Sequence, residues 1–224
     1  IPNYDEKKVQ EIGLKVKTPK GRYDRFRDRI MFPIRSHHGE IIGFGGRALG
    51  DEKPKYINSS DSKIFHKGQV LYGLHEAIKH KESTLLVVEG YMDVITLQAA
   101  GIKGAVAAQG TAFTPEHFSL AARYAENIIF CFDGDAAGEK AASKAFHAIL
   151  PSLRDQVSCF FLQMPNNEDP DTYINKHGIN SFSTLMKEAV PFSDYLTKVV
   201  PKDIPQTSLE GQAKRLTVIQ QQLD

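Results

Sequence analysis

Residues 127–135 read Asn-Ile-Ile-Phe-Cys-Phe-Asp-Gly-Asp, an apolar run that ends abruptly in two acids. A short apolar run of this kind predicts a strand buried on both faces of a parallel sheet. Residues 85–88 and 157–162 are similar runs, and each also leads, directly or after a short loop, to acids. Ligands bind α/β sheets at the carboxyl ends of the strands. The sequence therefore predicts five carboxylates at one sheet edge: Glu89, Asp133, Asp135, Asp169 and Asp171.

Five carboxylates gathered at one edge would repel one another unless a cation lay among them. Oxygen ligands without His or Cys partners suit a hard divalent ion, so Mg2+ or Mn2+ is expected. Each acid also has a simpler interpretation. Glu89 could be an exposed loop acid, and Asp135 and Asp169 could serve only to cap the helices that follow them. The metal hypothesis depends on all these acids lying at equivalent edges of one sheet.

Strands and helices alternate through the part of the chain that holds these acids. The expected strands are 84–88, 104–108, 127–132 and 157–163, and the expected helices are 91–100, 114–125, 136–150 and 170–177. Such alternation predicts an α/β fold with a mainly parallel sheet, right-handed crossovers and helices on both faces. Two more helices are expected, at 181–190 and 209–223.

The first 82 residues are rich in β signals instead. The pattern predicts a helix over 6–14, hairpin strands at 29–35 and 40–46, a third strand at 55–58 and a helix over 71–81. Pro33 indicates an edge strand or a bulge, and His37 and His38, in the hairpin turn, are expected to face solvent. Because nothing precedes the first helix that could pack against it, we expect the chain to be a fragment of a longer protein.

The composition, 41% hydrophobic and 25% charged, is ordinary for a soluble globular protein. No apolar stretch approaches the roughly 20 residues that span a bilayer, and no secretory leader is visible. Cys131 and Cys159 lie inside apolar runs, so we expect free, buried cysteines in a reducing cytoplasm. The net charge of +1 hides a basic part, with 17 Lys and Arg against 11 Asp and Glu in residues 1–82, beside an acidic remainder. Such asymmetry suits a polyanion held beside a metal site.

The basic part contains candidate phosphate contacts. Residues 43–47, Gly-Phe-Gly-Gly-Arg, lack the context of a Walker loop or a dinucleotide fingerprint, so we expect a strand bulge that points Arg47 outwards. Arg25, Arg27 and Arg29 alternate at strand spacing and should share one face. Lysines near aromatic residues suit phosphate contact with base stacking, although a solvated face is the simpler interpretation; they are Lys55, Lys63 and Lys67, beside Tyr56 and Phe65.

Taken together, these motifs resemble the RNA-polymerase core of bacterial DNA primases of the DnaG type. The matching segments are 23–34, 42–47, 54–59, 64–68, 71–73, 88–93, 132–138 and 168–172. The acidic motifs belong to the wider topoisomerase–primase (Toprim) domain, whereas the preceding basic segments are specific to primases. The resemblance runs clearly from about residue 20 to residue 192. It implies a basic α+β subdomain over 1–82, a Toprim domain over 83–178 and a helical subdomain over 179–224.

The resemblance also implies roles for particular residues. Glu89, Asp133 and Asp135 would carry the chemistry and, with Asp169 and Asp171, hold Mg2+ or Mn2+. The nucleotide would be bound by Arg47, Lys55, Tyr56, Asn58, Lys67 and Asp93, and nucleic acid by Arg25, Arg27 and Arg29. The family's zinc-binding module and helicase-binding domain are missing from this sequence, so no zinc is expected here.

The implied function is synthesis of short RNA primers on single-stranded DNA from nucleoside triphosphates. Replicative helicase and single-strand-binding protein would be partners of the full-length protein, and this fragment is expected to be a monomer without membrane contact. Two alternatives stay open. One is a metal-dependent nuclease on the same scaffold, and the other is a catalytically idle core that binds nucleotides or nucleic acid.

Overall fold

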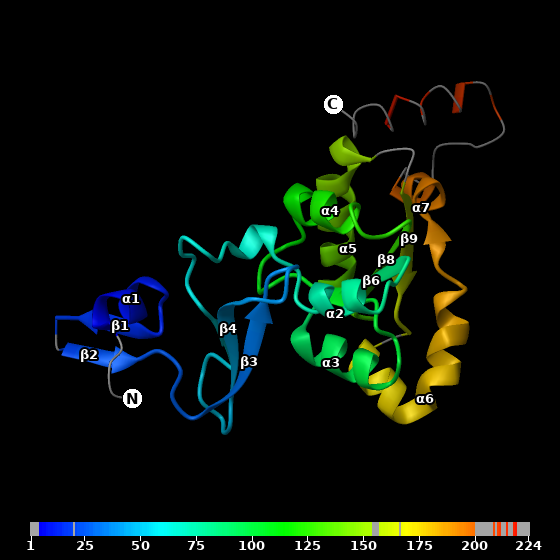
Figure 1. The fold of residues 1–224 in the computed structure, drawn as a ribbon. Coiled ribbons are helices and arrows are strands. Elements are labelled where there is room, and N and C mark those ends of the chain that lie inside the picture. The colour runs from blue at the N-terminus through cyan, green and yellow to red at the C-terminus, as the bar shows by residue number, and fades with distance from the viewer. Residues whose placement is uncertain are drawn as a thin grey trace.

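The computed structural model describes residues 5–19, 21–153, 157–165 and 167–199, together with positions 208, 210, 211, 214, 217 and 218. Within these residues, sheets of two, three and five strands occur. Figure 1 shows the two small N-terminal sheets, in blue and cyan, to one side of the five-stranded sheet. No helix of the described part is long and apolar enough to cross a membrane. The helix expected over 209–223 lies outside the described residues, apart from scattered positions.

The five-stranded sheet has the order β10-β9-β8-β6-β7, and all its pairs are parallel except that of β10 with β9. Its strands are β6 Thr84–Val88, β7 Ala105–Ala107, β8 Asn127–Phe132, β9 Ser158–Gln163 and β10 Val190–Pro191. Its helices are α3 Tyr91–Ala99, α4 Pro115–Ala121, α5 Ala136–Ile149, the 3-10 turn η2 Leu150–Ser152, α6 Pro170–Met186 and α7 Phe192–Val199. The predicted α/β class is confirmed.

Helices cover both faces of this sheet because its inner strands are apolar at nearly every position. Along β6, Leu85 and Val87 join the core under α4 and α5, whereas Leu86 and Val88 join the core under α3 and α6. Cys131 and Cys159 are buried and free, as predicted. Two apolar cores therefore pack against the two faces of the sheet.

The predicted boundaries needed correction on the C-terminal side. The two helices expected at 170–177 and 181–190 are present as the two parts of α6, which meet at a kink at Gly178, where φ is 80°, but the second part ends at Met186 and not at residue 190. The helix expected over 114–125 ends as α4 at Ala121. The short strand β10 was not predicted, because two residues carry no readable periodicity.

The N-terminal part consists of small antiparallel units. Their elements are α1 Glu6–Glu11, β1 Lys15–Thr18, β2 Gly21–Asp24, β3 Arg29–Arg35, β4 Ile41–Ala48, β5 Tyr56–Asn58, the 3-10 turn η1 Lys67–Gln69 and α2 Leu74–Lys79. The β3–β4 hairpin and the third strand are as predicted, and Pro33 lies on the edge strand β3. The hairpin of β1 and β2 was missed because its residues are mostly polar and half-buried at best.

Two predictions about the backbone of this part are wrong. Arg25, Arg27 and Arg29 do not share a strand face, because β2 ends at Asp24 and β3 begins only at Arg29. The pairing of β4 with β3 runs without interruption from Gly43 to Ala48. The register shift lies between Ile34 and Arg35 of β3, where the paired residue of β4 changes from Gly43 to Ile41. The glycines of β4 therefore serve close packing and not a bulge.

Two side chains also depart from prediction. Phe65 is 1% exposed and belongs to the core, so it is not free to stack on a base. His37 is half-buried, not exposed, and its ring contacts those of His38 and Tyr124. Burial, followed by the nearby His38 and Arg123, lowers the pKa of His37. His38 is exposed as expected.

Candidate functional site

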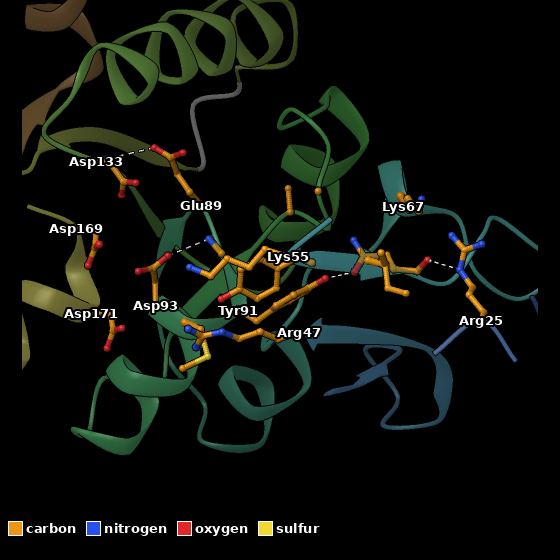
Figure 2. Close-up of a pocket in the computed structure, with 17 residues that line it drawn as sticks. Arg25, Arg47, Lys55, Lys67, Glu89, Tyr91, Asp93, Asp133, Asp169 and Asp171 are labelled. Carbon is orange, nitrogen blue, oxygen red and sulfur yellow. Dashed lines mark hydrogen bonds between the residues drawn. The ribbon is translucent and has the colours of Figure 1, made fainter. Parts of the chain in front are cut away.

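A cavity of about 630 Å³ lies between the start of α3 and the strands β4 and β5. Acids and cations both line it, in a segregated arrangement. Figure 2 shows the acids gathered at one end and Lys67 and Arg25 at the other, with Arg47 and Lys55 between. The acids are Glu89, Asp93, Asp133, Asp169 and Asp171. Five of the six predicted acids thus share one cavity, and Asp135 is the exception.

Three strand ends are tied together at the acidic end. Glu89 follows β6, and its Oε1 accepts a hydrogen bond from the main-chain nitrogen of Asp133, which follows β8, at 3.1 Å. The main-chain oxygen of Asp133 accepts from Nε2 of Gln163, the last residue of β9, at 2.5 Å. The parallel register therefore delivers both acids to one point, as the sequence predicted.

The carboxylate of Asp133 is poorly compensated. Its Oδ1 is buried and has no hydrogen-bond partner among the described residues. Burial raises the pKa of Asp133 to about 7, and the charges of Glu89, Asp93 and Asp169 act in the same direction. Burial likewise raises the pKa of Asp93 to about 6, although its Oδ2 accepts a hydrogen bond from the nitrogen of Gly90 at 3.0 Å. Such a cluster becomes favourable when it holds a proton or a cation.

The capping interpretation is correct for two of the acids. Oδ1 of Asp135 accepts from the nitrogens of Ala137 and Gly138, both at 2.8 Å, at the start of α5. Oδ1 of Asp169 accepts from the nitrogen of Thr172 at 2.6 Å at the start of α6. Capping leaves the second oxygen of each carboxylate available, so a second role is compatible with it.

Asp171 is held differently. Its Oδ1 accepts from Oγ1 of Thr96 at 2.6 Å and from Nδ2 of Asn175 at 2.9 Å. The bond from Thr96 joins α6 to α3 and orients Asp171 at the cavity wall. Thr96 was not predicted, because a threonine inside a helix gives no signal of such a contact.

The acidic end fits a divalent cation in charge and in donor type. Its donors are all carboxylate oxygens, which Mg2+ and Mn2+ prefer. Among the described residues, no three His, Cys, Asp or Glu side chains already converge as a metal-binding group. The unpartnered oxygen of Asp133 and the mutual repulsion of the acids are the features that support the fit.

Asn58 joins the cationic part of the cavity to the acidic part. Its Oδ1 accepts from the hydroxyl of Tyr91 on α3, and its Nδ2 donates to the main-chain oxygen of Gln109 at 2.9 Å. Its main-chain oxygen accepts from Nε of Arg25 at 2.9 Å. A Cβ at Gly45 would lie 2.9 Å from the Tyr91 ring, so only glycine lets β4 approach α3 this closely. Asn58 was predicted as a nucleotide contact; it lines the cavity, and its side chain also holds the two parts together.

The predicted basic residues differ in how they are held. Arg47 and Lys55 line the cavity, and the Arg47 guanidinium lies 5.7 Å from the centroid of the Tyr56 ring, within the range of a cation–π contact. Arg29 donates to the main-chain oxygens of residues 46, 54 and 55 and does not line the cavity. Neither Arg27 nor Lys63 lines the cavity.

Two residues next to the five-stranded sheet, His117 and Thr114, hold the main chain at Lys67 and Gly68. Neither was predicted from the sequence. The buried His117 on α4 places Nε2 2.8 Å from the main-chain oxygen of Lys67, and its Nδ1 accepts from the nitrogen of Thr114 at 3.1 Å. The ring is therefore neutral with its proton on Nε2, and burial lowers its pKa. Oγ1 of Thr114 donates to the oxygen of Gly68 at 2.6 Å. In sequence, Thr114-Pro115 reads only as a helix start.

Comparison with known proteins points to one family. Residues 2–78 match the family model "DNA primase catalytic core, N-terminal domain", and residues 86–174 match the model "Toprim-like". The chain is 47% identical over 213 residues to DNA primase of Pasteurella multocida strain Pm70. The aligned region covers 94% of this chain and 37% of that protein. The chain thus spans about a third of the length of the curated relatives it matches.

Solved structures agree with the sequence matches. A DNA primase domain from Pseudomonas aeruginosa superposes with a TM-score of 0.91 at 45% identity, over 97% of this chain and 70% of that one. A DnaG primase catalytic domain bound to single-stranded DNA superposes with a TM-score of 0.87 at 42% identity, over 97% and 72% of the two chains.

Proposed function

The chain belongs to the DnaG-type family of bacterial DNA primases, and from this membership we propose that it synthesises short RNA primers on a single-stranded DNA template. One observation carries the proposal: a single cavity has carboxylates at one end and arginine and lysine at the other. A nucleoside triphosphate that lies along such a cavity places its phosphates between cationic side chains and acids that can share a metal ion with them.

Nucleotidyl transfer joins the 3′-hydroxyl oxygen of the primer to the α-phosphorus of the triphosphate. The bond from that phosphorus to the oxygen of the β-phosphate breaks, and pyrophosphate leaves. Glu89, an exposed acid that lines the cavity, would accept the hydroxyl proton. Mg2+ or Mn2+ held by these acids would lower the pKa of the hydroxyl and neutralise phosphate charge. The residues proposed to hold it are Glu89, Asp133, Asp135, Asp169 and Asp171.

The remaining cavity residues bind and orient the nucleotide. Arg47, Lys55 and Lys67 contact the triphosphate, and the Tyr56 ring, 38% exposed, offers a surface for a base. Asn58 and Asp93 act by holding the walls, through Tyr91 and Gly90 respectively. Arg25 and Arg27 are proposed to contact the template backbone, because both terminal nitrogens of Arg29 donate to main-chain oxygens, whereas the bond from Arg25 to Asn58 uses its Nε.

The decisive assay combines the full-length protein with single-stranded DNA, nucleoside triphosphates and either Mg2+ or Mn2+. New RNA supports primer synthesis, shortened DNA would support a nuclease, and binding without either product would support an idle core. Glu89→Gln should abolish RNA synthesis, whereas the matched variant Glu126→Gln, at an exposed acid outside the main cavity, should not. Normal synthesis by Glu89→Gln would refute the assignment of the site.

Several narrower proposals follow from the same function. In the full-length protein, replicative helicase and single-strand-binding protein would be partners through domains outside this chain, and zinc would belong to such a domain. The subdomain boundaries 1–82, 83–178 and 179–224, the monomeric state and action in the cytoplasm are also proposals. Limited proteolysis and light scattering of the purified chain would test the boundaries and the monomeric state.

A further inference from the structure

A second cavity, of about 340 Å³, lies on the other side of Glu89. Its walls are the end of β6, residues 111–113 and one face of α5. Glu89 and Ala108 line both cavities. The first cavity is built from α3 and the start of α6, whereas the second is built from α5 and the segment that leads into α4. The two cavities therefore open on opposite sides of the sheet edge and meet at a catalytic acid.

The second cavity combines an apolar floor with two cations. Val87, Phe113 and Phe132 are buried and line it. Lys140 and Lys144 also line it, one helical turn apart on α5, and both are exposed. The ion pairs found among the described residues involve other lysines, namely Lys15, Lys79 and Lys176. Two lysines beside Glu89, spaced so that one nucleic-acid strand could contact both, are suited to binding the phosphates of its backbone.

We propose that this second cavity binds the 3′ end of the RNA primer, with Lys140 and Lys144 on its terminal phosphates. The inference rests on the proposed function, because chain extension brings two substrates to the same acids. The triphosphate occupies the first cavity, where Arg47, Lys55 and Lys67 lie. The primer hydroxyl must approach from another direction, and the second cavity is the one that shares Glu89. Its apolar floor contacts the terminal sugar and base.

The test measures extension of an RNA primer already annealed to a DNA template by the full-length protein. Lys140→Ala combined with Lys144→Ala should raise KM for the primer–template about tenfold and lower the salt slope of its binding by about one to two. kcat and KM for the nucleoside triphosphate should stay unchanged. Replacing both lysines by arginine should restore KM. Lys187→Ala, at an exposed lysine outside both cavities, is the matched control.

Crosslinking supplies a second, independent readout. An RNA primer with 4-thiouridine at its 3′ end should crosslink to residues 111–113 or 137–144, as mapped by mass spectrometry of the wild-type protein. Crosslinks confined to β3–β5 would overturn the proposal. So would an unchanged primer KM in the double variant, which would make α5 an ordinary solvated helix.

Three further outcomes separate this inference from its premise. If the double variant loses affinity for template alone to the same extent, the second cavity holds template and the primer assignment is wrong. If Glu89→Gln abolishes synthesis but the double variant extends primers normally, only the primer site is wrong. If Glu89→Gln synthesises normally, the proposed function fails and this inference fails with it.

Discussion

The acidic and the cationic ends of the main cavity are built in different ways. Every acid of the first end follows a strand or lies at the start of a helix, so the sheet register and the helix starts place its main chain. The cations come from β4, η1, the residue before β5 and the segment between β2 and β3, and long-range contacts place them, such as the bond from His117 to the main-chain oxygen of Lys67. The acidic end is thus set by local sequence and topology, whereas the cationic end depends on how two halves of the molecule meet.

The largest effect is expected at the acidic end. Asp133→Asn preserves side-chain volume but removes the charge whose oxygen lacks a partner, so kcat should fall by about two to three orders of magnitude. Asp135→Asn retains a good helix cap, and we expect a comparable loss if Asp135 also binds metal. Primer synthesis and thermal melting would be measured together. A normal rate for Asp135→Asn would leave that residue as a cap alone.

A smaller effect is expected from single changes at the cationic end, where several residues share one task. Arg47→Ala should raise KM for the triphosphate about tenfold, and the salt slope of nucleotide binding should fall by about one. Lys53→Ala is the control, because Lys53 is exposed nearby but does not line the cavity. An unchanged salt slope for Arg47→Ala would remove this residue from the phosphate contacts.

The contact between α4 and η1 can be tested by replacing His117, which bonds to the main-chain oxygen of Lys67. His117→Ala removes a buried donor and acceptor, so unfolding should become easier by about 1–3 kcal/mol. Because Lys67 then loses its anchor, KM for the triphosphate should rise a few-fold while kcat is retained. Calorimetry and steady-state kinetics measure both, with the exposed His80→Ala as control. Lower stability with an unchanged KM would show that His117 only packs.

The smallest effect concerns stability without metal. The pKa of Asp133 rises from 3.8 to about 7 on folding, so the folded state holds the proton more tightly. Its ionisation therefore lowers stability progressively between about pH 4 and pH 7. In EDTA, Asp133→Asn should match the wild type at pH 3.5 and melt a few degrees higher at pH 8. A melting difference that does not change with pH would contradict this origin, and Glu126→Gln should show none.

The α/β part and its acids were predictable because strand runs, helix starts and acids coincide in the sequence. The ends of β6 and β8 fall where the runs stop, at Val88 and Phe132. The capping of Asp135 and Asp169 was also foreseen as an alternative. What could not be predicted is that Asp135 lies outside the cavity, since caps and cavity acids have the same spacing.

The N-terminal part was less predictable because its residues act through distant partners. Three alternating arginines read as a strand, but the chain turns between Asp24 and Arg29. A glycine-rich run read as a bulge, but its missing side chains make room for Tyr91, Phe26 and Phe65. The contact of His117 with Lys67 could not be predicted from the sequence either, because the two residues lie 50 positions apart along the chain.

Gly45 has one more consequence. At Gly45, β4 packs directly against the Tyr91 ring, and this contact sets the distance between the cationic and the acidic parts of the cavity. Any larger residue at position 45 would push β4 away from α3 and move the two parts of the cavity apart. The width of the cavity therefore depends on the absence of a side chain at position 45.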